Sequence, residues 1–272
     1  MKKNGLTAHC LIRNEERWIW YAINSVINYV DQILVFDTGS TDNTVKIVES
    51  IKSSKIIVEQ KGIVDKKKFT QLRQEMLERT ATAWFMILDG DEIWPKAAIR
   101  ELTNAVGVAR QEIEAIVVAQ WMCQGDIFHY SKEIEELAED RSGRRGFWLP
   151  RAWRLNKGLH AIGLYGVESF ADIHDINVSY WELNRLKYLK HKFFHMSFLP
   201  RSSSIQKDRL VMMRAPKTKF SRGVSFPSGI QFPEVFFKDR PAQILSVWRH
   251  MTLLDKVSGL YYRTLNFLRC QF

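Results

Sequence analysis

The chain has 272 residues, 46% of them hydrophobic and 26% charged, and its 40 basic and 30 acidic side chains give a net charge of +10. This composition excludes a disordered chain, and no uncharged apolar run approaches the ~18 residues that a transmembrane helix needs. The excess positive charge lies in residues 147–272, which carry 20 basic and 8 acidic side chains. Such a surface attracts nucleic acid, anionic lipid or a phosphate-bearing substrate.

The first 120 residues alternate between short apolar runs and amphipathic segments. The apolar runs predict strands at 6–12, 32–36, 55–59, 84–88 and 115–122. The segments between them have apolar residues at helical spacing and predict helices at 15–29, 41–53, 67–80 and 96–110. Strands that alternate with helices, and lack polar residues at every second position, are typical of a parallel sheet covered on both faces. We therefore expect an α/β fold.

The later part of the chain is less regular. Residues 123–146 predict an irregular, partly acidic insertion, and residues 147–198 predict short aromatic-rich strands or loops that complete the sheet. A helix is expected over 205–214. From Pro241 onward, apolar side chains recur at helical spacing and predict an amphipathic helix; they are Ile244, Val247, Trp248, Met251 and Leu254.

Acidic side chains follow three of the predicted strands where each strand ends. They are Glu15, Asp37, Asp89 and Asp91. The carboxyl ends of parallel strands lie at one edge of a sheet, where ligands bind. Carboxylates crowded at that edge repel one another unless a cation is present. Asp89-Gly90-Asp91 therefore indicates a site for Mg²⁺ or Mn²⁺ that keeps open positions for substrate phosphates. The alternative is an Asp-Gly turn without a metal.

Three segments, LTAHCLIRNEE, ILVFDTGSTDNT and WFMILDGDE, occur in this order, each at the end of a predicted strand. Together they resemble the signatures of the family 2 glycosyltransferases with the GT-A fold, strongly over about residues 5–95 and more weakly over 145–200. No Gly-rich Walker loop is present and no G-x-G-x-x-G follows the first strand, which argues against a kinase or a dinucleotide dehydrogenase. The resemblance implies a mostly parallel central sheet with flanking helices.

The resemblance also implies the reaction. A sugar would move, with inversion, from a nucleoside-diphosphate sugar to a hydroxyl group of a cell-surface glycan or lipid-linked acceptor, and we expect a UDP-sugar as the donor. By the same resemblance, the loop at Asn14 and Glu15 meets the nucleoside, Asp37 contacts the base, and Arg73 and Asp89 lie near the donor nucleotide.

The metal ligands follow from the resemblance as well. Asp89 and Asp91 match the family's metal-binding pair, with Asp91 as the direct ligand. GT-A enzymes often take a third ligand from a histidine beyond the general base, and His191 and His195 both fall in that region. We favour His195, because the residues after it lead out of a predicted strand into a loop.

Inverting transfer also needs a group that takes the proton of the acceptor hydroxyl. Glu168 matches the glutamate that serves as this base in the family. The alternative is that Glu168 forms a structural ion pair with Arg151 or Arg154.

The resemblance divides the chain into a catalytic domain, 1–214, and a basic, partly amphipathic helical appendage, 215–272. The catalytic domain would have a nucleotide-sugar half at about 1–122 and an acceptor half at about 123–214. The apolar stripe after Pro241 either rests on an anionic membrane surface or packs on the catalytic domain.

We expect a cytoplasmic protein, which could associate peripherally with the inner face of the membrane. Three scattered cysteines fit a reducing compartment, and the N-terminus lacks a signal-peptide pattern. Two other functions compete with the glycosyltransferase interpretation. A nucleotidyltransferase would use the same carboxylates and metal. A basic nucleic-acid-binding protein would explain the charge, but the sequence contains no helix-turn-helix, zinc or RNA-binding signature, so we expect no nucleic-acid partner.

Overall fold

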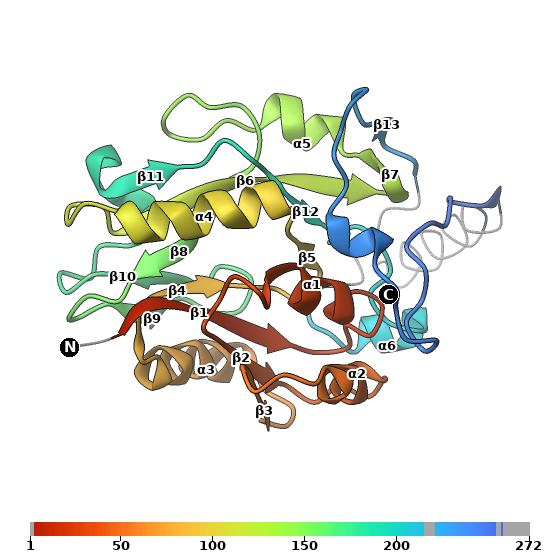
Figure 1. Ribbon diagram of the computed structural model, residues 1–272, viewed down its shortest axis with the longest axis horizontal. Helices are drawn as coiled ribbons and strands as arrows, with labels where there is room; N and C mark the ends of the chain where they lie inside the picture. Colours follow the sequence, from red (N-terminus) through yellow and green to blue (C-terminus); the bar gives the residue numbers. More distant parts are fainter. Residues whose placement is uncertain (1–2, 215–220, 254–256, 258–272) are drawn as a thin grey trace, which may run out of the picture.

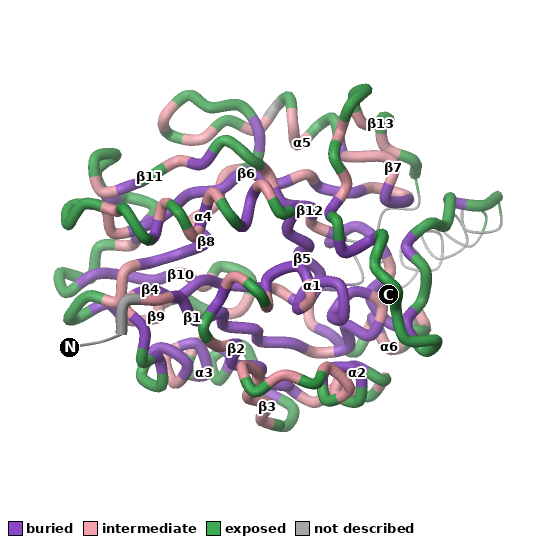
Figure 2. Tube along the Cα trace, in the orientation of Figure 1, coloured by how far each residue is buried: buried purple, intermediate pink, exposed green. Residues whose placement is uncertain are grey.

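The computed structural model describes residues 3–214, 221–253 and 257 (Figure 1). Its N-terminal half is built on four parallel strands in the order β3-β2-β1-β4. These strands are β1 (Lys3–Ile12), β2 (Gln32–Asp37), β3 (Ile56–Gln60) and β4 (Thr82–Ile87). Each was predicted from an apolar run, and the central strands are buried as such runs require (Figure 2).

Four helices cover the two faces of this sheet. They are α1 (Ile19–Val26), α2 (Thr44–Ser50), α3 (Lys66–Arg79) and α4 (Lys96–Val108). Side chains of α1, α2 and α4 share one buried cluster with Ala8 and Cys10 of β1, while α3 packs against Leu11 on the opposite face. Alternate residues of a strand point to opposite faces, so β1 contributes side chains to the hydrophobic clusters on both faces of the sheet. The α/β class with a mostly parallel central sheet is therefore confirmed.

An antiparallel strand interrupts the sheet beyond β4. Strand β8 (Trp148–Arg154) lies between β4 and β6 (Ala115–Gln124) and runs antiparallel to both. The apolar pattern predicted strands in this region but did not assign their direction. A hydrophobic strand that is buried on both faces has the same pattern in either direction.

The remaining elements are short. Strand β5 (Glu92–Ile93) pairs with β12 (Phe193–His195), which also pairs with β6. The other elements are β7 (Asp126–Tyr130), α5 (Lys132–Leu137), β9 (His160–Ile162), β10 (Ser169–Ala171), η1 (Val178–Tyr180), η2 (Leu183–Arg185), β11 (Leu186–Tyr188), α6 (Ile205–Arg209), β13 (Val224–Ser225) and η3 (Glu234–Phe237).

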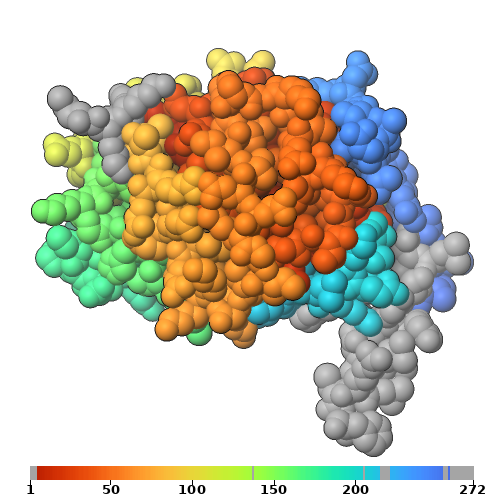
Figure 3. Space-filling model, turned by 90° about the horizontal axis from the view of Figure 1, so that it is seen from below, coloured from red at the N-terminus to blue at the C-terminus, as the bar shows by residue number. Residues whose placement is uncertain are grey.

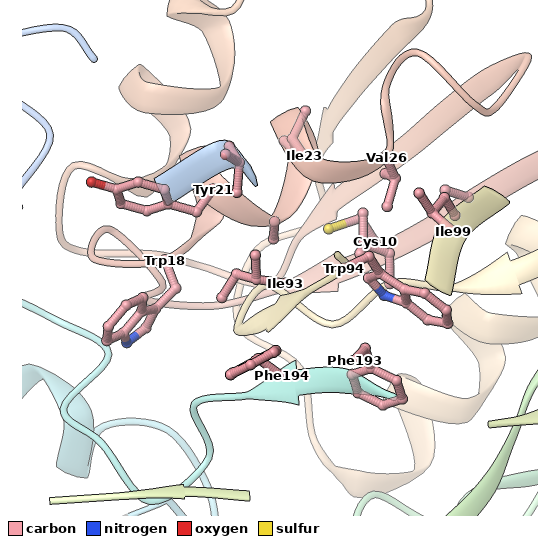
Figure 4. Close-up of a cluster of buried hydrophobic side chains, with 14 of the residues drawn as sticks. Cys10, Trp18, Tyr21, Ile23, Val26, Ile93, Trp94, Ile99, Phe193 and Phe194 are labelled. Atoms are coloured by element: carbon pink, nitrogen blue, oxygen red, sulfur yellow. The ribbon is translucent and has the colours of Figure 1, made fainter. Parts of the chain in front are cut away.

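A cluster of buried hydrophobic side chains, several of them aromatic, packs around β5 and β12 (Figure 4). Trp94 stacks on Phe193, with the ring centroids 4.8 Å apart. Phe194 pairs with Ile93 in the backbone register, and the same two strands place His195 opposite Glu92. The site residues that flank this cluster are therefore held by close-packed side chains.

Residues 241–252 do not form the predicted helix. They form turns, bends and irregular backbone. Ile244, Val247 and Met251 are buried at 2%, 5% and 7% exposure, and Ile244 and Val247 join the main core cluster. Three of the five stripe residues thus pack on the domain, as one of the two alternatives required. Trp248 is 38% exposed, and Leu254 lies outside the described residues. In the space-filling view the blue residues, which include this segment, lie beside the orange-red residues of the N-terminal region (Figure 3).

Candidate active site

A cavity of about 460 Å³ lies at the carboxyl ends of β1 and β4. Ligands bind at this edge in open parallel α/β sheets. Six of the residues predicted from the sequence line the cavity: Glu15, Arg73, Asp89, Asp91, Glu168 and His195. The structure thus brings together side chains from α3, from β12, from the segments that follow β1 and β4, and from the loop between β9 and β10.

Asn14 and Asp37 do not line this cavity. Asn14 is buried with a positive φ of 54°. Its side-chain oxygen accepts from the backbone N–H of Thr41 at 2.7 Å, and its amide donates to the carbonyl of Lys207 at 2.9 Å. Asp37 accepts the backbone N–H groups of Gly39 and Ser40, at 3.1 and 3.0 Å. Both side chains therefore order loops beside the cavity, and their contact with a nucleotide stays a prediction.

Asp91 is the most deeply buried carboxylate of the cavity, at 1% exposure. Its Oδ2 lies 2.8 Å from Nη1 of Arg201 and 3.3 Å from Nε2 of His195. Burial acts to raise the pKa of this carboxyl, but the charges of Arg201 and His195 outweigh it and hold the pKa well below its usual range. Asp91 is therefore ionised, and its Oδ1 accepts no hydrogen bond among the described residues.

His195 reaches Asp91 with one nitrogen and Gln120 with the other. Its Nδ1 lies 2.7 Å from Oε1 of Gln120 on β6. His191, the alternative ligand, instead bonds Glu101 through Nδ1 at 2.8 Å and is exposed. Of the two histidines, the structure brings only His195 to the cavity.

Asp89 faces arginines rather than Asp91. Its Oδ1 lies 3.2 Å from Nη2 of Arg73, and its Oδ2 lies 3.7 Å from Nη2 of Arg151. Burial favours a raised pKa for Asp89, but Arg151 and Arg73 lower it below its ordinary value. Arg151 also pairs with Glu92, which is fully buried and whose pKa burial raises well above its usual value.

Glu15 closes the cavity on the β1 side. It pairs with Arg214 and lies 3.4 Å from Nη1 of Arg201. Burial raises the pKa of Glu15 to about 8 in spite of these two arginines. Arg214 also donates to the carbonyls of Asn14 and Arg13, so it ties the segment after α6 to the end of β1.

Glu168 lies in the loop between β9 and β10. Its carboxylate accepts the backbone N–H of Gly166, and it lines the same cavity as Asp89 and Asp91. Neither of the arginines suggested as structural partners pairs with it. Arg151 pairs with Asp89 and Glu92, and Arg154 donates to three backbone carbonyls.

The fit to a divalent cation rests on two side chains. Within the described part of the chain, no three His, Cys, Asp or Glu side chains are arranged to hold one ion. The predicted trio of Asp89, Asp91 and His195 is therefore not assembled around a point. Asp91 and His195 do fit: their facing atoms are 3.3 Å apart, close to the ~3.0 Å between neighbouring ligands of an octahedral Mg²⁺ site.

Four residues of this site were not predicted in these roles. Arg151, Arg201 and Arg214 supply most of the positive charge around the carboxylates, and Gln120 orients His195. The crowded carboxylates predicted a bound cation. In the structure, these three arginines supply much of the positive charge that was expected from it. The one available signal was the excess of basic residues after position 147, which does not single out any arginine.

The profile of glycosyl transferase family 2 matches residues 11–164, more than half of the chain. The chain belongs to glycosyl transferase family 2. Among curated relatives it is similar to an uncharacterized glycosyltransferase of Rickettsia felis, 34% identical over 87 residues, which are 32% of this chain and 29% of that protein. It is also similar to the SPbeta prophage-derived glycosyltransferase SunS of Bacillus subtilis, 32% identical over 91 residues, 34% of this chain and 21% of SunS. These matches span less than a third of either relative.

Solved structures of glycosyltransferases are similar to this family 2 chain at low identity. TarS 1–349 of S. aureus is 14% identical, with a TM-score of 0.48 over 77% of this chain and 65% of that one. Glucosyl-3-phosphoglycerate synthase of Mycobacterium tuberculosis is 17% identical, with a TM-score of 0.48 over 71% of this chain and 72% of that one. The mannosyltransferase PcManGT of Pyrobaculum calidifontis, in complex with GDP-Man and Mn²⁺, is 17% identical, with a TM-score of 0.38 over 56% and 45% of the two chains.

Proposed function

We propose that this family 2 protein is a metal-dependent, inverting glycosyltransferase that uses a nucleoside-diphosphate sugar, with UDP-sugar as the expected donor. One observation carries the proposal. A single cavity at the carboxyl ends of β1 and β4 combines a buried Asp91–His195 pair, several arginines and the carboxylate of Glu168. A diphosphate leaving group and an acceptor hydroxyl need these three kinds of group.

Asp91 and His195 would hold Mg²⁺ or Mn²⁺, and the bound ion would stabilise the charge that develops on the leaving diphosphate. Arg73, Arg151 and Arg201 line the same cavity and present guanidinium groups. Guanidinium groups form paired hydrogen bonds with phosphate oxygens. In this scheme Asp89 keeps Arg73 and Arg151 in position beside the donor, at the distances already given.

Glu168 is the general base of this proposal. Its carboxylate would take the proton of the acceptor hydroxyl as that oxygen attacks the anomeric carbon, and the bond to the diphosphate breaks on the opposite side, which inverts the configuration. The loop that carries Glu168 contains Gly163 and Gly166, both with positive φ. Such glycines allow the loop to adjust around an acceptor.

The proposed acceptor is a cell-surface glycan or a lipid-linked sugar, reached at an anionic membrane surface on the cytoplasmic side. Phe237 and Trp248 support this part of the proposal: they are 68% and 38% exposed, and their ring centroids lie 4.9 Å apart. Exposed basic side chains at Lys238 and Arg249 follow each ring in sequence. Aromatic and basic side chains together suit the interface of an anionic bilayer. No helix of the described residues is long and apolar enough to cross a bilayer.

A panel of nucleotide sugars, assayed for release of the nucleoside diphosphate with and without a chelator, tests the proposal. Release of free UDP that stops when the chelator is added supports it. A product that retains the nucleoside phosphate would instead support the competing nucleotidyltransferase function. Full release in excess chelator would contradict the role of the metal.

A further inference from the structure

The guanidinium of Arg201 bridges two buried carboxylates in the cavity. Its Nη1 lies 2.8 Å from Oδ2 of Asp91 and 3.4 Å from Oε1 of Glu15. Arg201 is 8% exposed and Asp91 is 1% exposed, so water screens their attraction only weakly. The contact with Asp91 is the shorter of the two, and Glu15 also pairs with Arg214, so Asp91 is the main negative partner of Arg201.

Arg201 and a divalent cation compete for the same oxygen. Oδ2 of Asp91 is approached by both Nη1 of Arg201 and Nε2 of His195, the atom that would bind the ion. An ion at this position adds two positive charges beside a buried guanidinium, and like charges repel strongly where solvation is poor. The ion therefore binds well only if negative charge arrives with it or the guanidinium moves away.

The backbone of Arg201 is fixed, so only its side chain is able to move. Its N–H donates to Asp208 at 3.3 Å, and its carbonyl accepts the N–H of Arg17 at 3.1 Å. The preceding carbonyl, of Pro200, accepts the indole N–H of Trp18 at 2.9 Å. In contrast, the Nε of the Arg201 side chain has no hydrogen-bond partner among the described residues. The side chain lines the cavity, where a diphosphate would lie.

We propose that Arg201 is an internal counter-ion of Asp91 in the protein alone, and that it transfers to the diphosphate of the donor when donor and metal bind. This inference rests on the proposed metal-dependent function and adds a binding order to it. The metal alone binds weakly, because Arg201 occupies its carboxylate. Metal and nucleoside diphosphate bind cooperatively, because the diphosphate draws Arg201 away and offsets the charge of the ion.

Titrations of the full chain with Mn²⁺ test this proposal, with free Mn²⁺ measured by electron paramagnetic resonance. They are run without nucleotide and with saturating UDP, with GDP in parallel. In the wild-type protein we expect the nucleotide to tighten Mn²⁺ binding by at least about tenfold. In Arg201→Gln we expect Mn²⁺ alone to bind at least about tenfold more tightly than to the wild type, and the effect of the nucleotide to shrink.

Arg100→Gln is the matched control, because it removes the same charge from an exposed residue of α4 and should change neither affinity. Unchanged Mn²⁺ affinity in Arg201→Gln, folded by circular dichroism, would overturn the counter-ion role and leave the proposed function standing. If that variant does not fold, the wild-type titration decides, since equal Mn²⁺ affinity with and without nucleotide also overturns the inference. No Mn²⁺ binding under either condition would overturn the metal-dependent function itself.

Discussion

Oε1 of Gln120 lies 2.7 Å from Nδ1 of His195, across the pairing of β6 and β12. Because a carbonyl oxygen only accepts hydrogen bonds, this contact places the proton of the neutral imidazole on Nδ1. Nε2 faces the ionised Asp91 at 3.3 Å, so it donates to that carboxylate when the ring is protonated and offers its electron pair to a cation when the ring is neutral. In the proposed function, Gln120 would orient the ring of His195 toward a cation beside Asp91.

Replacing Gln120 with leucine should weaken metal binding by about 10–100-fold, because the ring loses the partner that fixes its tautomer and orientation. The measurement is Mn²⁺ affinity in the presence of saturating UDP. Gln124→Leu is a control at the end of the same strand, where the side chain contacts Ser221 outside the cavity. Equal loss in both variants would mean that the effect is not transmitted through His195.

Asp91→Asn should reduce turnover by at least about 10²-fold, since it removes the negative ligand but keeps its shape. It also leaves the buried Arg201 without its main partner, so the free energy of unfolding should fall as well. Steady-state kinetics and urea denaturation measure the two effects separately. Undiminished turnover in the folded variant would remove Asp91 from the mechanism.

Glu168→Gln should lower kcat by roughly 10²–10⁴ and change donor affinity little, because proton transfer from the acceptor does not contribute to binding the donor. Glu49→Gln, at an exposed position of α2, is the matched control. The comparison uses kcat with saturating substrates and the dissociation constant of UDP. A collapse of donor affinity with unchanged kcat would assign Glu168 to the donor site instead.

The stability of the protein should fall as the pH rises from about 4.5 towards 8, in part because of Glu15. Burial raises the pKa of this group from 4.5 to about 8 on folding. Over that interval the folded state holds a proton that the unfolded state releases, so each pH unit favours unfolding by up to about 1.4 kcal/mol. Urea denaturation at several pH values should show a shallower decline for Glu15→Gln. Parallel curves would show that Glu15 titrates normally.

Phe237→Ser combined with Leu245→Ser should reduce cosedimentation with anionic liposomes several-fold, because both side chains are exposed, at 68% and 54%. Removing the chain from Pro241 onward is a poor test, because it also deletes Ile244 and Val247 from the core. Ile63→Ser, at an exposed apolar residue in the loop after β3, controls for general hydrophobicity. If the double variant and the wild type sediment equally at low and high salt, this surface does not bind membranes.

The sequence by itself determined the elements of the N-terminal half and much of the site. Apolar runs and helical spacing are local properties, and local spacing decides which residues form strands and helices. The position of Asp89-Gly90-Asp91 directly after β4 placed these carboxylates at the ligand-binding edge, because parallel strands end at one edge. Six of the predicted residues indeed line one cavity.

Only the tertiary structure decided the charge partners of those residues. Arg201 and Arg214 reach Asp91 and Glu15 from a segment that follows β12, and no local spacing encodes so distant a contact. The antiparallel direction of β8 was likewise undetermined, because burial on both faces gives the same pattern in either direction. The stripe at Ile244 and Val247 is apolar whether it faces lipid or protein. The tertiary structure shows that both side chains pack in the main core cluster.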